Sequence, residues 1–427
     1  MARSIFDNAL LFDGERDPFH GAIMIEDDRI LWTGMAFEAP GAPDDHHYDL
    51  GGRMLMPGLI SCHLHPDNLM FGLANFLAGE QLGKERPPGF LMAVGVRTCR
   101  TLLESGFTGY VGAACSHNID EQLRMAIAED VIPGPRIRPC SHHIGTTADN
   151  NDSPKWWHDF RTPGIDRFAD GPDDLRRLVR DEIRCGARII KFYASSGQAI
   201  PDRHGTRNMS RSEMAAIVET AHERGVPVRA HVVDRDLILE CLDLGVDVID
   251  HGNELDEECI TRMAASGTFW VPSLLYSRVA LDRGADPDGP YGTGWNNVRR
   301  MIPKAHAAGV RMLIGDDYGG GSMRHDIGVY ARELSLYCRE TGLSPRDVLR
   351  WGTADAGLLL AGRAGEVGIL RPGAYADMLV LSENPLEDIS VLEQPQETIA
   401  EVIHDGRFLR GTLAAIPYSI RASASRV

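Results

Sequence analysis

The chain has a shortage of positive charge and no long apolar run, and each absence excludes a class of protein. Its 427 residues carry 44 Lys and Arg against 61 Asp and Glu, which gives a net charge of −17. Negative charge repels phosphate backbones and anionic lipids, so we expect no nucleic-acid partner and no membrane partner. Because the chain contains no run of about 18 apolar residues, we also expect no membrane span.

Paired cysteines are missing as well. The eight cysteines are scattered, and none belongs to a Cys-x-x-Cys pair. Several fall in strand-like or helix-like stretches, which indicates buried reduced thiols instead of a disulfide framework. The first four residues, Met1 to Ser4, do not lead into the apolar segment of a signal peptide. Together these absences predict a cytoplasmic protein.

The two ends of the chain are rich in strand patterns, whereas the middle alternates strands with helices. Residues 1–56 and 365–427 alternate apolar and polar positions, with an Asp-Gly hairpin signal at 405–406. We expect the two ends to form one small β-sandwich domain. Residues 57–364 repeat a strand and then a helix, which is typical of an α/β fold with a parallel sheet.

The middle segment holds eight candidate strands. They cover residues 58–62, 108–112, 136–140, 189–193, 226–231, 246–251, 268–272 and 311–315. Helical periods lie between them, for example over 212–224 and 236–244. Eight strand–helix units predict a (β/α)₈ TIM barrel over 57–364, whose active site forms at the carboxyl ends of the strands.

Two histidines close the first of these strands. His63 and His65 are two residues apart, so in a strand both imidazoles point to the same face and toward one possible metal ion. A His-x-His pair also arises by chance, and most histidines are simply packed and hydrogen-bonded. The pair gains weight because other candidate ligands end the strands that follow.

Lys191 lies in the middle of an apolar strand, where an unpaired ammonium group would be costly. It allows three interpretations: a lysine paired with a carboxylate, a Schiff-base lysine, or a lysine carboxylated by CO₂ that bridges two metal ions. We favour the third, because several candidate ligands lie on neighbouring strands.

The remaining candidate ligands end strands five, six and eight. His231 and His251 close consecutive strands, and the pair Asp316-Asp317 follows the eighth. A lone histidine at either position would more often be structural, but two at equivalent ends favour a shared site. Only one of the two aspartates should face inward, where it could bind metal and take a proton from water.

At this point the chain resembles a known family, the amidohydrolase superfamily, in its imidazolonepropionase-like and Xaa-Pro dipeptidase-like branch. The resemblance extends over nearly the whole chain. The resemblance rests on six motifs. They are Pro-Gly-Leu-Ile at 57–60 before His-Leu-His at 63–65, Gly-Ala-Arg-Ile-Ile-Lys at 186–191, Ala-His at 230–231, Gly-Val-Asp-Val-Ile-Asp-His-Gly at 245–252, Gly-Asp-Asp at 315–317 and the closing segment 373–386.

The resemblance implies a binuclear metal centre. In it, His63 and His65 hold the more buried ion, His231 and His251 hold the other, and carboxylated Lys191 bridges the two. The expected cofactors are therefore two divalent ions, with zinc as the first choice. The family motif after strand eight matches best when Asp317 is the metal ligand and catalytic proton carrier, and a slip of one residue would make it Asp316.

The substrate region departs from the family pattern. The segment after strand three reads Ser-His-His-Ile-Gly at 141–145, so His142 or His143 could contact a substrate carbonyl or carboxylate. Tyr193 and Tyr276 lie near other strand ends and are further candidates for substrate binding. Core packing or loop solvation accounts for each of these residues about equally well.

The favoured function is hydrolysis of a C–N bond in an amide, carbamate, urea or dipeptide-like small molecule. A hydroxide held between the two ions would attack the carbonyl carbon, and Asp317 would pass the proton to the leaving nitrogen. Family members are often oligomeric, so the resemblance also allows a homo-oligomer.

Three alternatives stay open. A mononuclear deaminase of the same superfamily would carry a glutamate shortly after His231, where this chain has Val-Val-Asp-Arg-Asp. A non-catalytic scaffold relative would have lost metal ligands, whereas all six candidates are present. A Schiff-base lyase would need Lys191 without the histidines.

Overall fold

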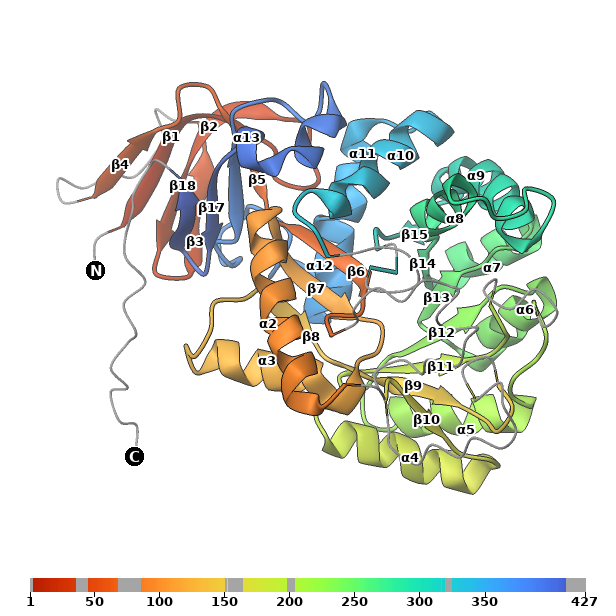
Figure 1. Cartoon of the computed structure of the whole chain (residues 1–427). Coiled ribbons are helices and arrows are strands. Elements are labelled where there is room, and N and C mark those ends of the chain that lie inside the picture. Colours follow the sequence, from red (N-terminus) through yellow and green to blue (C-terminus); the bar gives the residue numbers. More distant parts are fainter. Residues whose placement is uncertain are drawn as a thin grey trace.

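A mixed sheet from both chain ends lies beside a parallel sheet that is surrounded by helices (Figure 1). The computed structural model describes residues 3–35, 45–67, 86–149, 152, 164–197, 204–315, 317–318 and 325–411. None of the helices in these ranges is long and apolar enough to cross a membrane. All eight cysteines are free, and six of them are buried, as the sequence predicts.

The mixed sheet contains eight strands, drawn in red and blue in Figure 1. They are β1 (Ser4–Leu11), β2 (Phe19–Glu26), β3 (Arg29–Gly34), β4 (His46–Asp49), β5 (Met54–Pro57), β16 (Met378–Leu381), β17 (Ile399–His404) and β18 (Arg407–Gly411). The order is β18-β17-β16-β5-β1-β2-β3, with β4 beside β1. The predicted hairpin at Asp405-Gly406 joins antiparallel β17 and β18, and both turn residues have positive φ, as a tight hairpin requires.

The parallel strands form the second part of the fold. They are β6 (Leu59–Leu64), β7 (Phe107–Gly112), β8 (Arg136–Arg138), β9 (Cys140–Gly145), β10 (Asp166–Phe168), β11 (Ile189–Tyr193), β12 (Val228–Val232), β13 (Val248–His251), β14 (Phe269–Val271) and β15 (Arg311–Met312). The hydrogen-bonded orders are β6-β7-β8 and β10-β9-β11-β12-β13-β14-β15.

Helices follow most of these strands and cover the parallel sheet. They are α2 (Pro88–Glu104), α3 (Ile119–Ala128), α4 (Pro172–Arg184), α5 (Arg211–His222), α6 (Arg235–Leu244), α7 (Glu257–Ser266), α8 (Leu274–Asp282), α9 (Pro290–Ala307), α10 (Arg332–Thr341), α11 (Pro345–Trp351) and α12 (Ala354–Ala361), and the short α13 (Pro395–Thr398) belongs to the terminal part. The sequence signals act locally: Ser210 and Glu213 form a capping box on α5, and Gly245 ends α6 in the left-handed region.

Each predicted strand position holds a strand, with one correction. The strand expected over 136–140 is two strands, β8 and β9, because Pro139 has no N–H and interrupts the ladder. The Pro139 carbonyl instead accepts the N–H of Arg188 at 2.8 Å, and so leads the chain from β8 into the sheet of β9 and β11. On the other side, the Ile314 carbonyl accepts the N–H of Cys62 at 2.8 Å and connects the segment after β15 to β6.

The molecule therefore has an α/β fold with the parallel sheet typical of a TIM barrel, plus a mixed sheet from both ends. The apolar side chains of β6, β7 and β11 to β15 are buried, because parallel strands covered by helices have no solvent face. The domain limits at 56/57 and 364/365, and a two-layer sandwich in the terminal part, stay predictions.

Asp377 joins the two parts. Its carboxylate accepts two hydrogen bonds from Arg136 on β8, at 2.5 and 3.2 Å, and a third from the Asp405 N–H at 2.9 Å. We expect Asp377→Asn to lower the free energy of unfolding by about 2 kcal/mol, because it leaves the mostly buried Arg136 with a weaker partner. Urea denaturation of both proteins measures the loss, and an unchanged midpoint would contradict it.

Candidate active site

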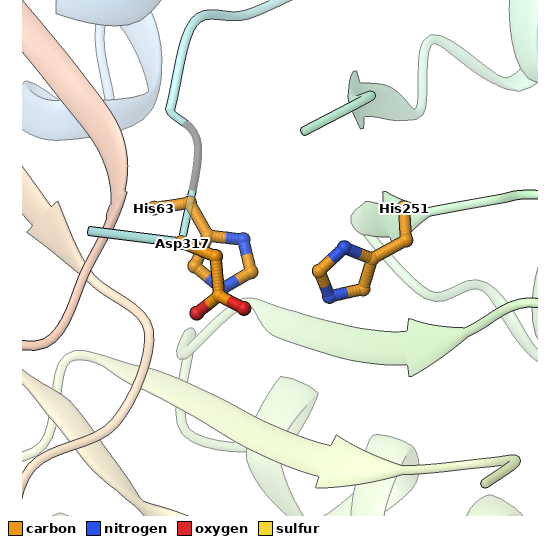
Figure 2. A group of neighbouring side chains, drawn as sticks. All are labelled: His63, His251 and Asp317. Atoms are coloured by element: carbon orange, nitrogen blue, oxygen red, sulfur yellow. The ribbon is translucent and has the colours of Figure 1, made fainter. Parts of the chain in front are cut away.

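Five of the six predicted ligands lie at or just after strand ends, and Lys191 lies in the middle of its strand. His63 lies in β6 and His65 directly follows it, while Lys191, His231 and His251 lie in β11, β12 and β13. The sixth, Asp317, follows β15. Figure 2 shows the His63 ring beside the Asp317 carboxylate, with the His251 imidazole facing them. The active-site end predicted from the sequence is therefore the end where these side chains meet.

The distances define a compact cluster. The Nε2 atoms of His65 and His63 lie 2.9 Å and 3.5 Å from Asp317 Oδ1. One ligand atom from each of His63, His251 and Asp317 falls within 4.8 Å of the others, so the three could hold one metal ion. The ring centroids of His231 and His251 are 4.5 Å apart, which brings the strand-five histidine to the same cluster.

Asp317 is the aspartate whose carboxylate faces the histidines. Its backbone has φ +58°, a left-handed conformation that is uncommon outside glycine, and this turn directs the side chain back toward β6. The side chain is 16% exposed, whereas that of His63 is 2% exposed, so Asp317 stays within reach of a ligand from solvent. Asp316, the alternative candidate, lies outside the described residues.

Burial prepares the histidines to act as ligands. It lowers the pKa of His63 and of His231 well below the usual value, and it lowers that of His251 to about 4. These imidazoles are therefore neutral near pH 7, the form that binds a metal. Burial raises the pKa of the Asp317 carboxyl, but its hydrogen bond with His65 and the neighbouring His63 hold that pKa well below the usual range.

One further observation indicates that these side chains could bind a metal ion. His231 Nε2 is buried and has no hydrogen-bond partner among the described residues, an arrangement that costs free energy unless a ligand occupies it. The space next to this atom is kept open by Gly197, where an added Cβ would lie 2.8 Å from His231 Nε2. A divalent cation would satisfy the nitrogen.

Lys191 pairs with a carboxylate that the sequence reasoning did not name. Its Nζ contacts Asp250, which also accepts two hydrogen bonds from Arg229 at 3.0 and 2.6 Å and lies 3.4 Å from His63 Nδ1. Burial, assisted by the Arg229 charge, lowers the pKa of Lys191 despite Asp250. Strand alternation could have found Arg229, which precedes His231 by two residues and so shares its face.

The four predicted substrate residues separate into two groups. His143, Tyr193 and Tyr276 lie beside the cluster: the His143 ring is 5.4 Å from that of His65, the Tyr193 ring stacks on that of His231 at 4.4 Å, and the Tyr276 ring is 6.4 Å from that of His251. His143 Nδ1 lies 3.2 Å from Asp166 Oδ1, and burial lowers the His143 pKa to about 4.

His142 is placed differently. Its Nδ1 lies 3.0 Å from Glu182 Oε1 on α4, and its Nε2 accepts the N–H of His117 at 3.1 Å. Both ring nitrogens are therefore engaged by the protein, because alternation along β9 turns His142 away from the face of His143. The structure gives no support to a substrate contact by His142, and His143 stays the candidate.

Comparisons with known proteins identify relatives over most of the chain. Residues 54–409 match the amidohydrolase family. An ochratoxinase of Aspergillus niger is 27% identical over 437 residues, which cover 94% of this chain and 85% of that protein. An imidazolonepropionase of Cutibacterium acnes is 26% identical, with 92% of this chain and 91% of that protein covered.

Solved structures give the same result. The crystal structure of the A. niger ochratoxinase superposes with a TM-score of 0.83 at 26% identity, over 98% of this chain and 97% of that one. A prolidase crystallised with N-methylphosphonate-L-proline superposes with a TM-score of 0.85 at 26% identity, over 96% of this chain and 100% of that one. The likeness thus extends over both parts of the fold.

Proposed function

The chain belongs to the amidohydrolase family, whose enzymes act on C–N bonds, and we propose that it is a binuclear metal-dependent hydrolase of a small-molecule amide, carbamate, urea or dipeptide-like compound. The observation that carries the proposal is the convergence of neutral histidines and one ionised carboxylate on a single buried point. His63, His65, Lys191, His231, His251 and Asp317 would be the ligands.

The six side chains suit two ions better than one. His63 and His65 come from one strand end, His231 and His251 from two others, and Asp317 lies between His63 and His65. Lys191, carboxylated by CO₂, would supply the anionic bridge between the two groups. Bound zinc would supply Lewis-acid polarisation of a carbonyl and would lower the pKa of a nearby water.

Asp317 is the residue suited to move the proton. Its Oδ1 lies 2.9 Å from His65 Nε2, and the partly exposed carboxylate can take a proton from water and deliver it to the leaving nitrogen. His65 is held in place for this contact, because its Nδ1 donates to the Ala114 carbonyl at 2.9 Å, which leaves Nε2 facing Asp317.

His143, Tyr193 and Tyr276 would bind the substrate. Tyr193 is 9% exposed, and its ring lies between those of His143 and His231, so it covers one side of the cluster with an aromatic face. The relatives are named an ochratoxinase, an imidazolonepropionase and a prolidase, and these names favour amide-type substrates for the present chain.

The structure does not support the deaminase alternative. The carboxylate that follows His231 most closely is Asp234, and its side chain caps helix α6 by accepting the Leu237 N–H at 2.9 Å. A carboxylate used in this way is not free to act as the acid and base of a mononuclear site. Retention of all six candidate ligands speaks equally against a scaffold.

A substrate panel measured with and without metal tests the proposal. Metal-replete protein is compared with chelator-treated and zinc-reconstituted protein on N-acyl amino acids, dipeptides, carbamates and phenylureas. We expect hydrolysis of at least one class, loss of more than 90% of it after chelation, and its return with zinc. Activity that survives complete removal of metal would contradict the mechanism, and ammonia release from an aminated ring would favour the deaminase.

A further inference from the structure

Glu333, a buried carboxylate in the first turn of α10, contacts one residue on each side of Asp317: the backbone of Gly315 and the side chain of Tyr318. Its two oxygens accept the N–H of Gly315 at 2.8 and 3.0 Å. The hydroxyl of Tyr337 donates to the same carboxylate at 2.9 Å, and the hydroxyl of Tyr318, which donates to the Tyr330 carbonyl at 2.8 Å, shares its proton with Glu333 over 3.3 Å. Gly315 and Tyr318 flank Asp317, so one side chain fastens the segment that carries the proposed proton carrier.

This segment needs external support because its backbone is strained. Asp317 has φ +58°, in the left-handed region, which costs a residue with a Cβ roughly 1 kcal/mol even though aspartate tolerates it better than most. Gly315 has φ +148° and lies so close to β6 that an added Cβ would be 2.3 Å from the His63 nitrogen. The segment is thus pressed against the strand that carries His63.

The opposite side of the segment is attached to β6 and His65 by backbone hydrogen bonds, in addition to the contact of the Asp317 carboxylate with His65. The Tyr318 carbonyl accepts the His65 N–H at 2.9 Å, and the Ile314 carbonyl accepts that of Cys62 at 2.8 Å. These bonds fix the distance between the segment and the histidines at the end of β6. They do not involve the Gly315 N–H. On the side of α10, the Glu333 carboxylate accepts this N–H, and the Tyr318 hydroxyl donates to the Tyr330 carbonyl at 2.8 Å.

A purely structural role explains Glu333 poorly. It is 1% exposed, and among the described residues it forms no ion pair, so its charge is balanced only by neutral donors. Burial raises its pKa to about 7. An uncompensated buried carboxylate costs free energy that an apolar side chain would avoid, so packing alone does not account for a glutamate at this position.

We propose that Glu333 is a positioning residue: by holding Gly315 and Tyr318 from α10, it fixes the Asp317 carboxylate at the distance from His63 and His65 that metal binding requires. The inference rests on the proposed function, because it needs Asp317 to be a ligand. It assigns Glu333 no contact with substrate or metal.

Cobalt binding tests the role without a known substrate. Co²⁺ is titrated into metal-free protein while its visible absorption, which depends on coordination geometry, is recorded. In Glu333→Gln one of the two accepting oxygens becomes an NH₂ group, so a single oxygen remains to accept from Gly315, Tyr318 and Tyr337. We expect Co²⁺ to bind at least about tenfold more weakly, as for other groups that orient metal ligands, with an altered absorption band.

Asp377→Asn is the matched control, because it also turns a buried carboxylate into an amide but lies in the terminal sheet. It should lower the melting temperature and leave Co²⁺ affinity and spectrum unchanged. Parental affinity and spectrum in Glu333→Gln would overturn the positioning role. Failure of the parent chain to bind Co²⁺ would instead overturn the proposed function, and the positioning role with it.

Tyr318→Phe decides the matter if Glu333→Gln does not fold. It removes one donor to Glu333, together with the hydrogen bond of 2.8 Å to the Tyr330 carbonyl, and keeps the carboxylate. The expected change is in the same direction and smaller, a roughly threefold loss of Co²⁺ affinity. Unchanged affinity in a folded Tyr318→Phe protein would overturn the proposal.

Discussion

Asp317→Asn is expected to lower kcat about 1,000-fold on any substrate that the parent chain hydrolyses. Asparagine keeps the shape of the side chain but cannot take up the proton that the attacking water loses, and proton transfer by a positioned group is worth roughly 10² to 10⁴ in rate. The substitution also removes the negative charge of a proposed metal ligand next to His63 and His65, which should lower kcat further. KM should change far less than kcat, because the carboxylate acts during the reaction instead of in binding.

The measurement is steady-state kinetics on zinc-reconstituted protein, with metal content determined on the same samples. Asp377→Asn serves again as the control, since it removes a buried carboxylate far from the cluster and should retain parental kcat. A variant at position 317 that keeps its metal and more than a tenth of parental kcat would remove Asp317 from its assigned role.

Lys191→Ala is expected to reduce the bound metal from about two divalent ions per chain to well below one. The bridging carbamate is the proposed anionic ligand common to both ions, so its loss weakens both sites at once. The fold should survive the change, because Asp250 keeps its two hydrogen bonds from Arg229 when the lysine is removed. Elemental mass spectrometry on purified protein gives the stoichiometry.

Two comparisons make this result specific. Lys304→Ala removes a lysine that is 46% exposed and pairs with Glu257 on the surface, and it should leave the metal content unchanged. Protein prepared with ¹³C-labelled bicarbonate should show a carbamate carbon resonance that is absent from Lys191→Ala. One ion per chain in both parent and variant would contradict the bridge and favour the deaminase. No metal after metal-replete expression would favour the scaffold or the Schiff-base lysine.

The sequence predicted the main features of the fold because they depend on local patterns. Alternation and helical period located eight strands, and the turn at Asp405-Gly406 followed from the positive φ that a tight hairpin needs. The pair His63 and His65 was found in the same way. Residues i and i+2 of a strand point to the same face, and this does not depend on the rest of the fold.

Local patterns failed where the backbone leaves the regular strand geometry. Alternation alone would place Asp250 and His251 on opposite faces of β13, yet both lie near His63, because His251 has φ +69° and turns away from the strand direction. The same kind of turn at Asp317, with φ +58°, accompanies the contacts of its carboxylate with His63 and His65. Alternation also left two candidate histidines after strand three, and only the contacts of His142 with Glu182 and His117 distinguished them.

The sequence by itself thus determined the types of residue available for chemistry and the strand ends that carry them, since both follow from composition and period. The tertiary structure decided which of these residues meet and what holds them there. Asp250 beside Lys191, and Glu333 behind Gly315, are contacts between positions 59 and 18 residues apart in the chain. Such partners are set by how strands and helices pack around a shared interior, and no local rule of spacing contains that information.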